Sequence, residues 1–202
     1  MYEPFAAAVG LGISLEDEVS SMVVDVGGGT SDAMILVGGE IVASDSIRIA
    51  GNAFDVAIEN GLRDQMRLAV GNRTAEDLKM AIMQSIEERK VFSVQGRSIS
   101  DGLPLEVEIS FDEVLDFITP CLDEIVEHIN LFIKRVSPEI LADLQNTRIY
   151  FVGGGPSIHT FSERIEEALN LKITVPNNPT TSVAAGTAII AKDPERYDKY
   201  FL

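Results

Sequence analysis

The apolar positions near the start of the chain predict one short helix and three adjacent strands. Pro4 suits the first turn of a helix and Gly10 suits its end, so residues 3–10 are expected to be helical. Three runs rich in Val and Ile follow, and their density predicts strands that are buried on both faces. These runs are residues 21–26, 33–37 and 40–49, and Gly38-Gly39 forms a tight turn between the last two.

A helical period replaces the strand pattern at residue 51. One helix is expected to begin at Gly51-Asn52, and Thr74 is expected to cap the next one. The inward positions of that second helix are Leu78, Ile82 and Ile86. Short alternating runs return between residues 90 and 109. This change of pattern predicts a small inserted subdomain over residues 53–110.

The remaining chain, residues 1–52 and 111–202, is expected to form one larger subdomain. Ser110 and Glu113 have the spacing of a capping box, which predicts a long helix from residue 111 to about residue 136. Beyond it, the apolar pattern predicts a short helix, then strand, helix, strand and helix in alternation. Those elements are a helix after Ser137, a strand over 148–152, a helix through Phe161, Ile165 and Leu169, a strand over 173–175 and a helix over 182–191.

Composition narrows the classes of partner. The 202 residues are 46% hydrophobic, which supports a substantial core, and carry a net charge of −16. A surface this negative repels nucleic acid and anionic lipid, so neither is expected to contact this segment directly. The single cysteine, Cys121, excludes an intramolecular disulfide and a cysteine-cluster metal site, and it fits a reducing cytoplasm. No apolar run approaches the roughly 18 residues of a membrane span.

Two junctions between a strand and a glycine triplet carry the candidate chemistry. The first strand runs into Gly27-Gly28-Gly29 before Thr30, and a second strand far downstream ends in Gly153-Gly154-Gly155. Glycine permits close approach of a ligand, and successive backbone N–H groups form an anion-binding concavity. One such triplet could equally be a hairpin turn. Two of them predict one phosphate-bearing ligand that is held from two sides.

Asp25 stands at the end of the first of these strands. A buried carboxylate is unfavourable unless it meets water, a cation or hydrogen-bond donors. Beside a phosphate loop, hydrated Mg²⁺ is the economical partner, because it keeps several waters and needs only one or two carboxylates. The alternative is that Asp25 accepts hydrogen bonds from the glycine turn.

Other motifs for phosphate or metal binding are absent or isolated. The chain has no Walker P-loop spelling, and the Gly10-Leu-Gly12 pair follows a helix and lacks a third glycine. His128 and His159 stand apart from each other without metal-ligand spacing, so each is expected to be a packed or surface side chain.

At this point the chain resembles a known superfamily. The segment from Asp25 to Thr30 resembles the second phosphate loop of the actins, heat-shock chaperones and sugar kinases, and residues 152–155 resemble their adenosine loop. Further spellings narrow the resemblance to the MreB family of bacterial actins. They are Glu3-Pro4-Phe-Ala-Ala-Ala-Val-Gly10, Gly96-Arg97 through Gly102-Leu-Pro104, Ser137-Pro-Glu139 and the segment from Asn178 to Gly186.

The resemblance implies a fold. It is an α/β, ribonuclease-H-like actin ATPase domain. Its sheet is mixed, its first three strands are antiparallel, helices cover both faces, and a small α+β subdomain is inserted. The predicted order of elements along this chain agrees with one half of that fold.

The resemblance also implies residue roles, with ATP and Mg²⁺ as cofactors. Glu3 would orient the attacking water and the Thr30 hydroxyl would assist it, while Asp25 would hold Mg²⁺ through water. Gly27, Gly28 and Gly29 would take the β- and γ-phosphates. Gly153, Gly154 and Gly155 would take the α-phosphate and nucleoside. Glu76 and Lys79 would touch ribose and adenine; without the resemblance, they would be an ordinary acid–base pair at i, i+3.

The sequence departs from the MreB pattern in three places. Ala50-Gly51-Asn52 replaces a glycine pair and an acid and is nearer to MamK, the magnetosome filament actin. Asn177-Asn178 replaces an acid before the late proline. The first phosphate loop of the superfamily has no counterpart, so the chain is expected to be the second large domain, either excised or naturally truncated.

The expected function is therefore the nucleotide-binding half of a cytoplasmic, filament-forming ATPase involved in cell shape or intracellular organisation. Partners would be ATP or ADP and further copies of the full-length protein. The chain alone is expected to bind ATP weakly and to hydrolyse it negligibly. Two alternatives stay open: a non-catalytic half-actin interaction module, and a MamK-type filament actin. A chaperone or sugar kinase half would share the glycine loops but not the spelling around Glu3.

Overall fold

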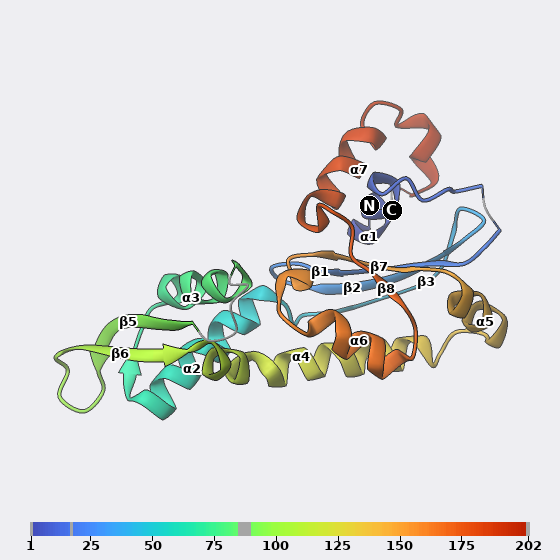
Figure 1. The fold of residues 1–202 in the computed structure, drawn as a ribbon. Helices are drawn as coiled ribbons and strands as arrows, with labels where there is room; N and C mark the ends of the chain where they lie inside the picture. Colours follow the sequence, from blue (N-terminus) through green and yellow to red (C-terminus); the bar gives the residue numbers. More distant parts are fainter. Residues whose placement is uncertain (1, 17, 85–89, 201–202) are drawn as a thin grey trace.

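The computed structural model describes residues 2–16, 18–84 and 90–200, and it contains two β-sheets joined by a long helix (Figure 1). The inward position predicted at Ile86 lies outside the described residues. No helix among the described residues combines the length and the apolar character needed to cross a membrane.

The larger sheet has five strands in the order β3-β2-β1-β7-β8. The first three are antiparallel neighbours, and β7 and β8 join parallel to β1. The predicted mixed sheet is therefore confirmed. The strands are β1 (Ser21–Val26), β2 (Ser31–Val37), β3 (Glu40–Ile47), β7 (Ile149–Gly153) and β8 (Ile173–Thr174).

Helices cover both faces of this sheet, as predicted (Figure 1). On one face, side chains of α1, α7 and the 3₁₀ helix η3 form a core with Val23 of β1 and Val152 of β7. On the other face, α4 and α6 pack against a larger core that includes Met22, Val24 and Phe151. The helices of both layers are α1 (Glu3–Gly10), α4 (Phe111–Ile133), α5 (Pro138–Asn146), α6 (Phe161–Leu169), α7 (Ser182–Ile190) and the 3₁₀ helices η1 (Gly155–Ser157), η2 (Pro179–Thr181) and η3 (Glu195–Tyr200).

The smaller sheet has the order β4-β5-β6 and is antiparallel. It lies with α2 and α3 at the N-terminal end of α4 (Figure 1). Its elements are α2 (Gly51–Met66), β4 (Leu68–Ala69), α3 (Asn72–Gln84), β5 (Val91–Ser98) and β6 (Pro104–Ser110). The alternating pattern over 90–109 therefore does form strands, and the two-residue strand β4 was not predicted.

The capping box at the start of α4 is confirmed. The Ser110 side chain accepts from the Glu113 N–H at 3.3 Å, and the Glu113 carboxylate accepts from the Ser110 N–H at 2.8 Å. Two N–H groups that the helix cannot bond internally are thereby paired. Helix α4 ends at Ile133 rather than near residue 136.

Two further sequence predictions are wrong. Thr74 does not cap α3, because the helix begins at Asn72 and the Gly71 carbonyl accepts from the N–H groups of Thr74 and Ala75. Strand β3 is not buried on both faces: it lies at the edge of the sheet, and its positions alternate between exposed and half-buried from Glu40 to Ile47.

Helices α1 and α7 touch through their backbones. A Cβ placed on Gly186 would lie 1.6 Å from the Ala6 carbonyl oxygen, and one placed on Gly10 would lie 2.2 Å from the Ser182 carbonyl oxygen. Glycine at these two positions therefore sets the spacing of the helix pair that covers one face of the sheet. The pair also holds Glu3, at the start of α1, against that face.

We predict that Gly186→Ala lowers the free energy of unfolding by about 3 kcal/mol, because backbone atoms must separate to admit the methyl group. Helix propensity alone would give the opposite sign, since Ala in a helix interior is about 1 kcal/mol better than Gly. Urea unfolding measures the difference. Gly71→Ala, where a Cβ meets nothing within 4 Å, is the control, and because Gly71 caps α3 it should cost no more than about 1 kcal/mol. A neutral or stabilising Gly186→Ala would contradict the close packing.

Candidate functional site

The two glycine junctions lie side by side because β1 and β7 are parallel neighbours. Their register pairs Asp25 with Val152 and Val26 with Gly153, so both strands reach their glycines at the same edge of the sheet. The Gly154 N–H donates to the Val26 carbonyl at 2.9 Å and ties the second junction to the first. The carboxyl ends of parallel strands are a common position for ligand sites.

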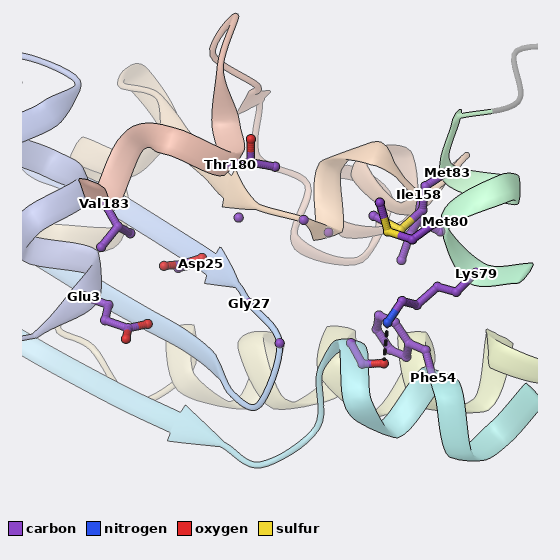
Figure 2. A pocket seen from close by; sticks show the side chains of 15 residues that line it. Glu3, Asp25, Gly27, Phe54, Lys79, Met80, Met83, Ile158, Thr180 and Val183 are labelled. Carbon is purple, nitrogen blue, oxygen red and sulfur yellow. Dashed lines mark hydrogen bonds between the residues drawn. The ribbon is translucent and has the colours of Figure 1, made fainter. Parts of the chain in front are cut away.

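A pocket of about 350 Å³ opens between these junctions (Figure 2), within the range of roughly 300–1,000 Å³ usual for small-molecule sites. Most of the residues predicted from the sequence line it: Glu3, Asp25, Gly27, Gly28, Lys79, Gly153, Gly154 and Gly155. Three predicted residues are not among its lining residues: Gly29, Thr30 and Glu76.

The second junction requires glycine for steric reasons. Gly153 has φ +83°, in the left-handed region, and a Cβ there would lie 2.4 Å from both the Asp25 carboxylate and the Val26 carbonyl oxygen. At Gly155 a Cβ would lie 2.7 Å from the Val26 Cβ. Gly154 differs, because its nearest neighbour would be the Met83 methyl at 3.6 Å, an ordinary contact. The backbone here packs directly on β1, with room on the pocket side of Gly154.

The first junction is held by α2. The N–H groups of Gly51 and Asn52, at the start of this helix, donate to the carbonyls of Gly27 and Gly28 at 3.1 and 2.7 Å. The Gly27 N–H donates to the Thr30 carbonyl at 3.0 Å. Within the described parts of the chain, no hydrogen bond engages the N–H of Gly28 or Gly29. The carbonyls are thus fixed while these two donors stay available to an anion.

Asp25 is a buried carboxylate, and no ion pair with a basic side chain is found for it among the described residues. Its side chain lies on the face of β1 that α1 covers, and the residue is 3% exposed. Burial, together with the nearby negative charges of Glu3 and Asp32, raises the pKa of Asp25 from 3.8 to about 6. None of the hydrogen bonds found among the described residues joins Asp25 to the glycine turn.

This environment fits a hydrated cation. Converging negative charge at Asp25 and Glu3 would be relieved by Mg²⁺ held through water, an ion that binds few protein ligands directly. In the described ranges, no group of three or more His, Cys, Asp or Glu side chains is placed to hold a metal ion.

Lys79 has a partner that the sequence did not indicate. Its Nζ lies 2.8 Å from Oδ1 of Asp55, donates to Oδ2 of the same residue at 2.9 Å and donates to the Gly51 carbonyl at 3.2 Å. Lys79 is 8% exposed and Asp55 3%. Glu76 is exposed, so the pairing of Lys79 with an acid at i, i−3 is replaced by a buried bridge from α3 to α2.

The apolar part of the pocket was also missed from the sequence. Met80 and Met83 of α3 line it together with Phe54 and Ile158, and Thr180 and Val183 line it from the last part of the chain. Figure 2 shows Glu3 and Asp25 at one end, Met80, Met83 and Ile158 at the other, and Gly27 between them. The helical spacing of Met80 and Met83 alone indicates core positions. Only the fold could reveal that these two side chains face a pocket.

The two histidines lie elsewhere. The His128 Nε2 lies 3.7 Å from an oxygen of Asp45, and the His159 ring meets Phe111 edge-on with centroids 6.1 Å apart. Neither lines the pocket. His128 is half-buried and His159 is exposed, which agrees with the prediction of packed or surface side chains.

The fold defines the class of protein, because it is the fold of the actin-like ATPases. The structure is similar to a crystal structure of MreB5 of Spiroplasma citri bound to ADP, with a TM-score of 0.90 and 30% identity over 98% of this chain and 61% of that one. A crystal structure of MreB5 bound to AMPPNP has a TM-score of 0.89 and 30% identity, and the match covers 99% of this chain and 61% of that one. A MamK double helical filament has a TM-score of 0.72 and 24% identity, over 95% of this chain and 58% of that one. This is a similarity of fold.

The sequence places the chain within this class. The MreB/Mbl protein family matches residues 1–199, and the chain belongs to that family. Among curated relatives, the cell shape-determining protein Mbl of Bacillus subtilis is 32% identical over 199 residues. That alignment covers 98% of this chain and 60% of Mbl, so the chain spans about three fifths of the relative's length.

We predict that Asp25→Asn raises the free energy of unfolding at pH 7.5 and that the gain disappears toward pH 4. A folded-state pKa near 6 against 3.8 in the unfolded chain means that ionised Asp25 destabilises the fold above pH 6 and has no effect below pH 4. A shift of this size corresponds to about 3 kcal/mol as an upper bound.

Urea unfolding from pH 4 to 8, with EDTA present, measures this difference. The variant Asp193→Asn, at an exposed position, is the control and should show no such trend. A gain for Asp25→Asn that is the same at every pH would contradict the account of Asp25.

Proposed function

We propose that this chain forms one wall of the nucleotide cleft of an MreB-like actin, with an adenine nucleotide and Mg²⁺ as ligands. The observation that carries the proposal is the convergence of both glycine junctions, Asp25 and Glu3 on one pocket. The relatives support the choice of nucleotide, because MreB5 was crystallised with ADP and with AMPPNP.

The polarity of the pocket orients the nucleotide. Phosphates belong beside Gly27 and Gly28, where the Gly28 N–H is available, and the base belongs at the end formed by Met80, Met83 and Ile158, which Figure 2 shows apart from Gly27. Backbone N–H groups bind phosphate whatever the net charge of the protein, so the value of −16 is no obstacle. Methionine suits the base because its thioether adapts to a flat ring.

Each acidic residue then has a role in phosphoryl transfer to water. When bound, Mg²⁺ offsets charge on the phosphate oxygens, and Asp25 would hold its water shell. Glu3 would orient the attacking water from the start of α1. The Thr30 hydroxyl would assist Glu3. The pocket lining does not include Thr30, Gly29 or Glu76, so phosphate contact is assigned first to Gly27, Gly28 and Gly153–Gly155.

We also propose the subdomain bounds and the cellular role of the full-length protein. We place residues 53–110 in the inserted small subdomain and residues 1–52 and 111–202 in the larger one. The full-length protein would self-associate into cytoplasmic filaments that serve cell shape or intracellular organisation. This follows the cell shape-determining role of Mbl and the double helical filament of MamK. No nucleic acid or direct membrane contact is assigned to this segment.

We predict that Gly28→Ala and Gly154→Ala each weaken the binding of Mg²⁺-ATP about tenfold, since a methyl group on the pocket side of either residue keeps the nucleotide from approaching the backbone. Both positions tolerate a Cβ in the nucleotide-free chain: its nearest neighbours would be 3.9 and 3.6 Å away, and neither residue has positive φ. Calorimetric titration measures the affinity, and Gly71→Ala is the matched control. Unchanged affinity in both variants would place the phosphates elsewhere.

We also predict that the 202-residue chain alone binds ATP weakly and hydrolyses it negligibly. Phosphoryl transfer depends on fixing the γ-phosphate and the water from both sides of the cleft, and loss of such positioning costs several orders of magnitude in rate. A phosphate-release assay tests this. Turnover at the rate of a full-length MreB would contradict it, and the absence of any nucleotide binding would favour the non-catalytic interaction module.

A further inference from the structure

Asp55 is not part of any motif that we connected with nucleotide binding, yet it is the buried partner of a residue that lines the pocket. It lies on α2, one turn after Gly51, and Lys79 reaches it from α3. Both oxygens of Asp55 lie within 2.9 Å of the Lys79 ammonium. A buried ion pair of this kind fixes geometry more than it adds stability.

The ammonium makes one further contact, and that contact points to the phosphate loop. Lys79 donates to the Gly51 carbonyl at 3.2 Å, the bond drawn as a dashed line in Figure 2. The N–H of Gly51 in turn donates to the carbonyl of Gly27, and the N–H of Asn52 to that of Gly28. A continuous path of hydrogen bonds therefore runs from α3, through the first turn of α2, to the loop.

The packing around Gly51 agrees with this path. A Cβ on Gly51 would lie 3.3 Å from the Gly27 carbonyl oxygen and 3.5 Å from Nζ of Lys79. The glycine lets the loop and the ammonium approach the same peptide from two sides. The first turn of α2 is thus clamped between them.

We propose that Asp55 is a positioning residue, which holds Lys79 on the first turn of α2 and so orders the phosphate loop. In this arrangement Lys79 acts on the phosphates through Gly51 and the loop backbone. A role of Lys79 confined to ribose and adenine would leave phosphate binding independent of Asp55. The effect on ligand binding rests on the proposed function, whereas the effect on the loop does not.

Two variants separate the positioning role from simple loss of folding. Asp55→Asn removes the carboxylate but leaves the ammonium buried. The double variant Asp55→Leu/Lys79→Met replaces the pair by apolar side chains of similar size, a change that is often neutral for stability, and it also removes the contact with Gly51. Asp123→Asn, which breaks the exposed Asp123–Arg164 pair (2.8 Å), is the control.

The first measurement is amide hydrogen exchange by NMR in the nucleotide-free chain. We expect the double variant to speed exchange at Gly51 and Asn52 about tenfold, while amides in the middle of α4, such as Ile125, and all amides of Asp123→Asn change little. Unchanged exchange at Gly51 and Asn52 in a folded double variant would overturn the proposal.

The second measurement compares two fragments of the ligand, each with Mg²⁺ present. We expect both variants to bind tripolyphosphate about tenfold more weakly and adenosine within about twofold of the original chain. Weakened adenosine binding with unchanged tripolyphosphate binding would overturn the proposal in favour of a direct nucleoside contact. If the original chain binds neither fragment, the proposed function is wrong, and the exchange rates still decide the role of Asp55.

Discussion

The parallel pairing of β1 with β7 is the constraint on which the rest of the site depends. Because Val26 pairs with Gly153, two glycine triplets about 125 residues apart in sequence meet at one edge of the sheet. A shift of one residue in β1 would turn Asp25 to the opposite face and separate it from α1. That shift is unfavourable, because Met22, Val24 and Val26 fill the core under α4 and the Asp25 carboxylate would enter this apolar core.

Three groups of contacts translate this register into a pocket. The backbone contact between α1 and α7 sets the position of Glu3, the α2 N-terminus fixes the carbonyls of the first glycine loop, and the Asp55–Lys79 pair closes the pocket on the side of α3. One end of the pocket carries the carboxylates of Asp25 and Glu3, and the other end is apolar. Under the proposed function, a divalent ion would offset the charge at the acidic end.

Much of the fold could be predicted from the sequence, because strong local signals agreed with it. Pro4, the Ser110–Glu113 capping box and the glycine triplets marked element ends that the structure reproduces, and the family resemblance implied the mixed sheet with three antiparallel strands. The failures have physical causes. The edge position of β3 and the backbone cap from Gly71 depend on tertiary neighbours, and so do the partnership of Asp55 with Lys79 and the exposure of Met80 and Met83 to the pocket. No pattern along the chain reports which helices will face each other.

The central claim is that both glycine junctions hold one nucleotide. An NMR titration of the labelled chain with Mg²⁺-ATP tests it most directly. The account predicts saturable amide shifts, with one common dissociation constant, at Gly27 and Gly28 and at Gly153, Gly154 and Gly155. Shifts confined to one junction, or binding that leaves both junctions unperturbed, would contradict it.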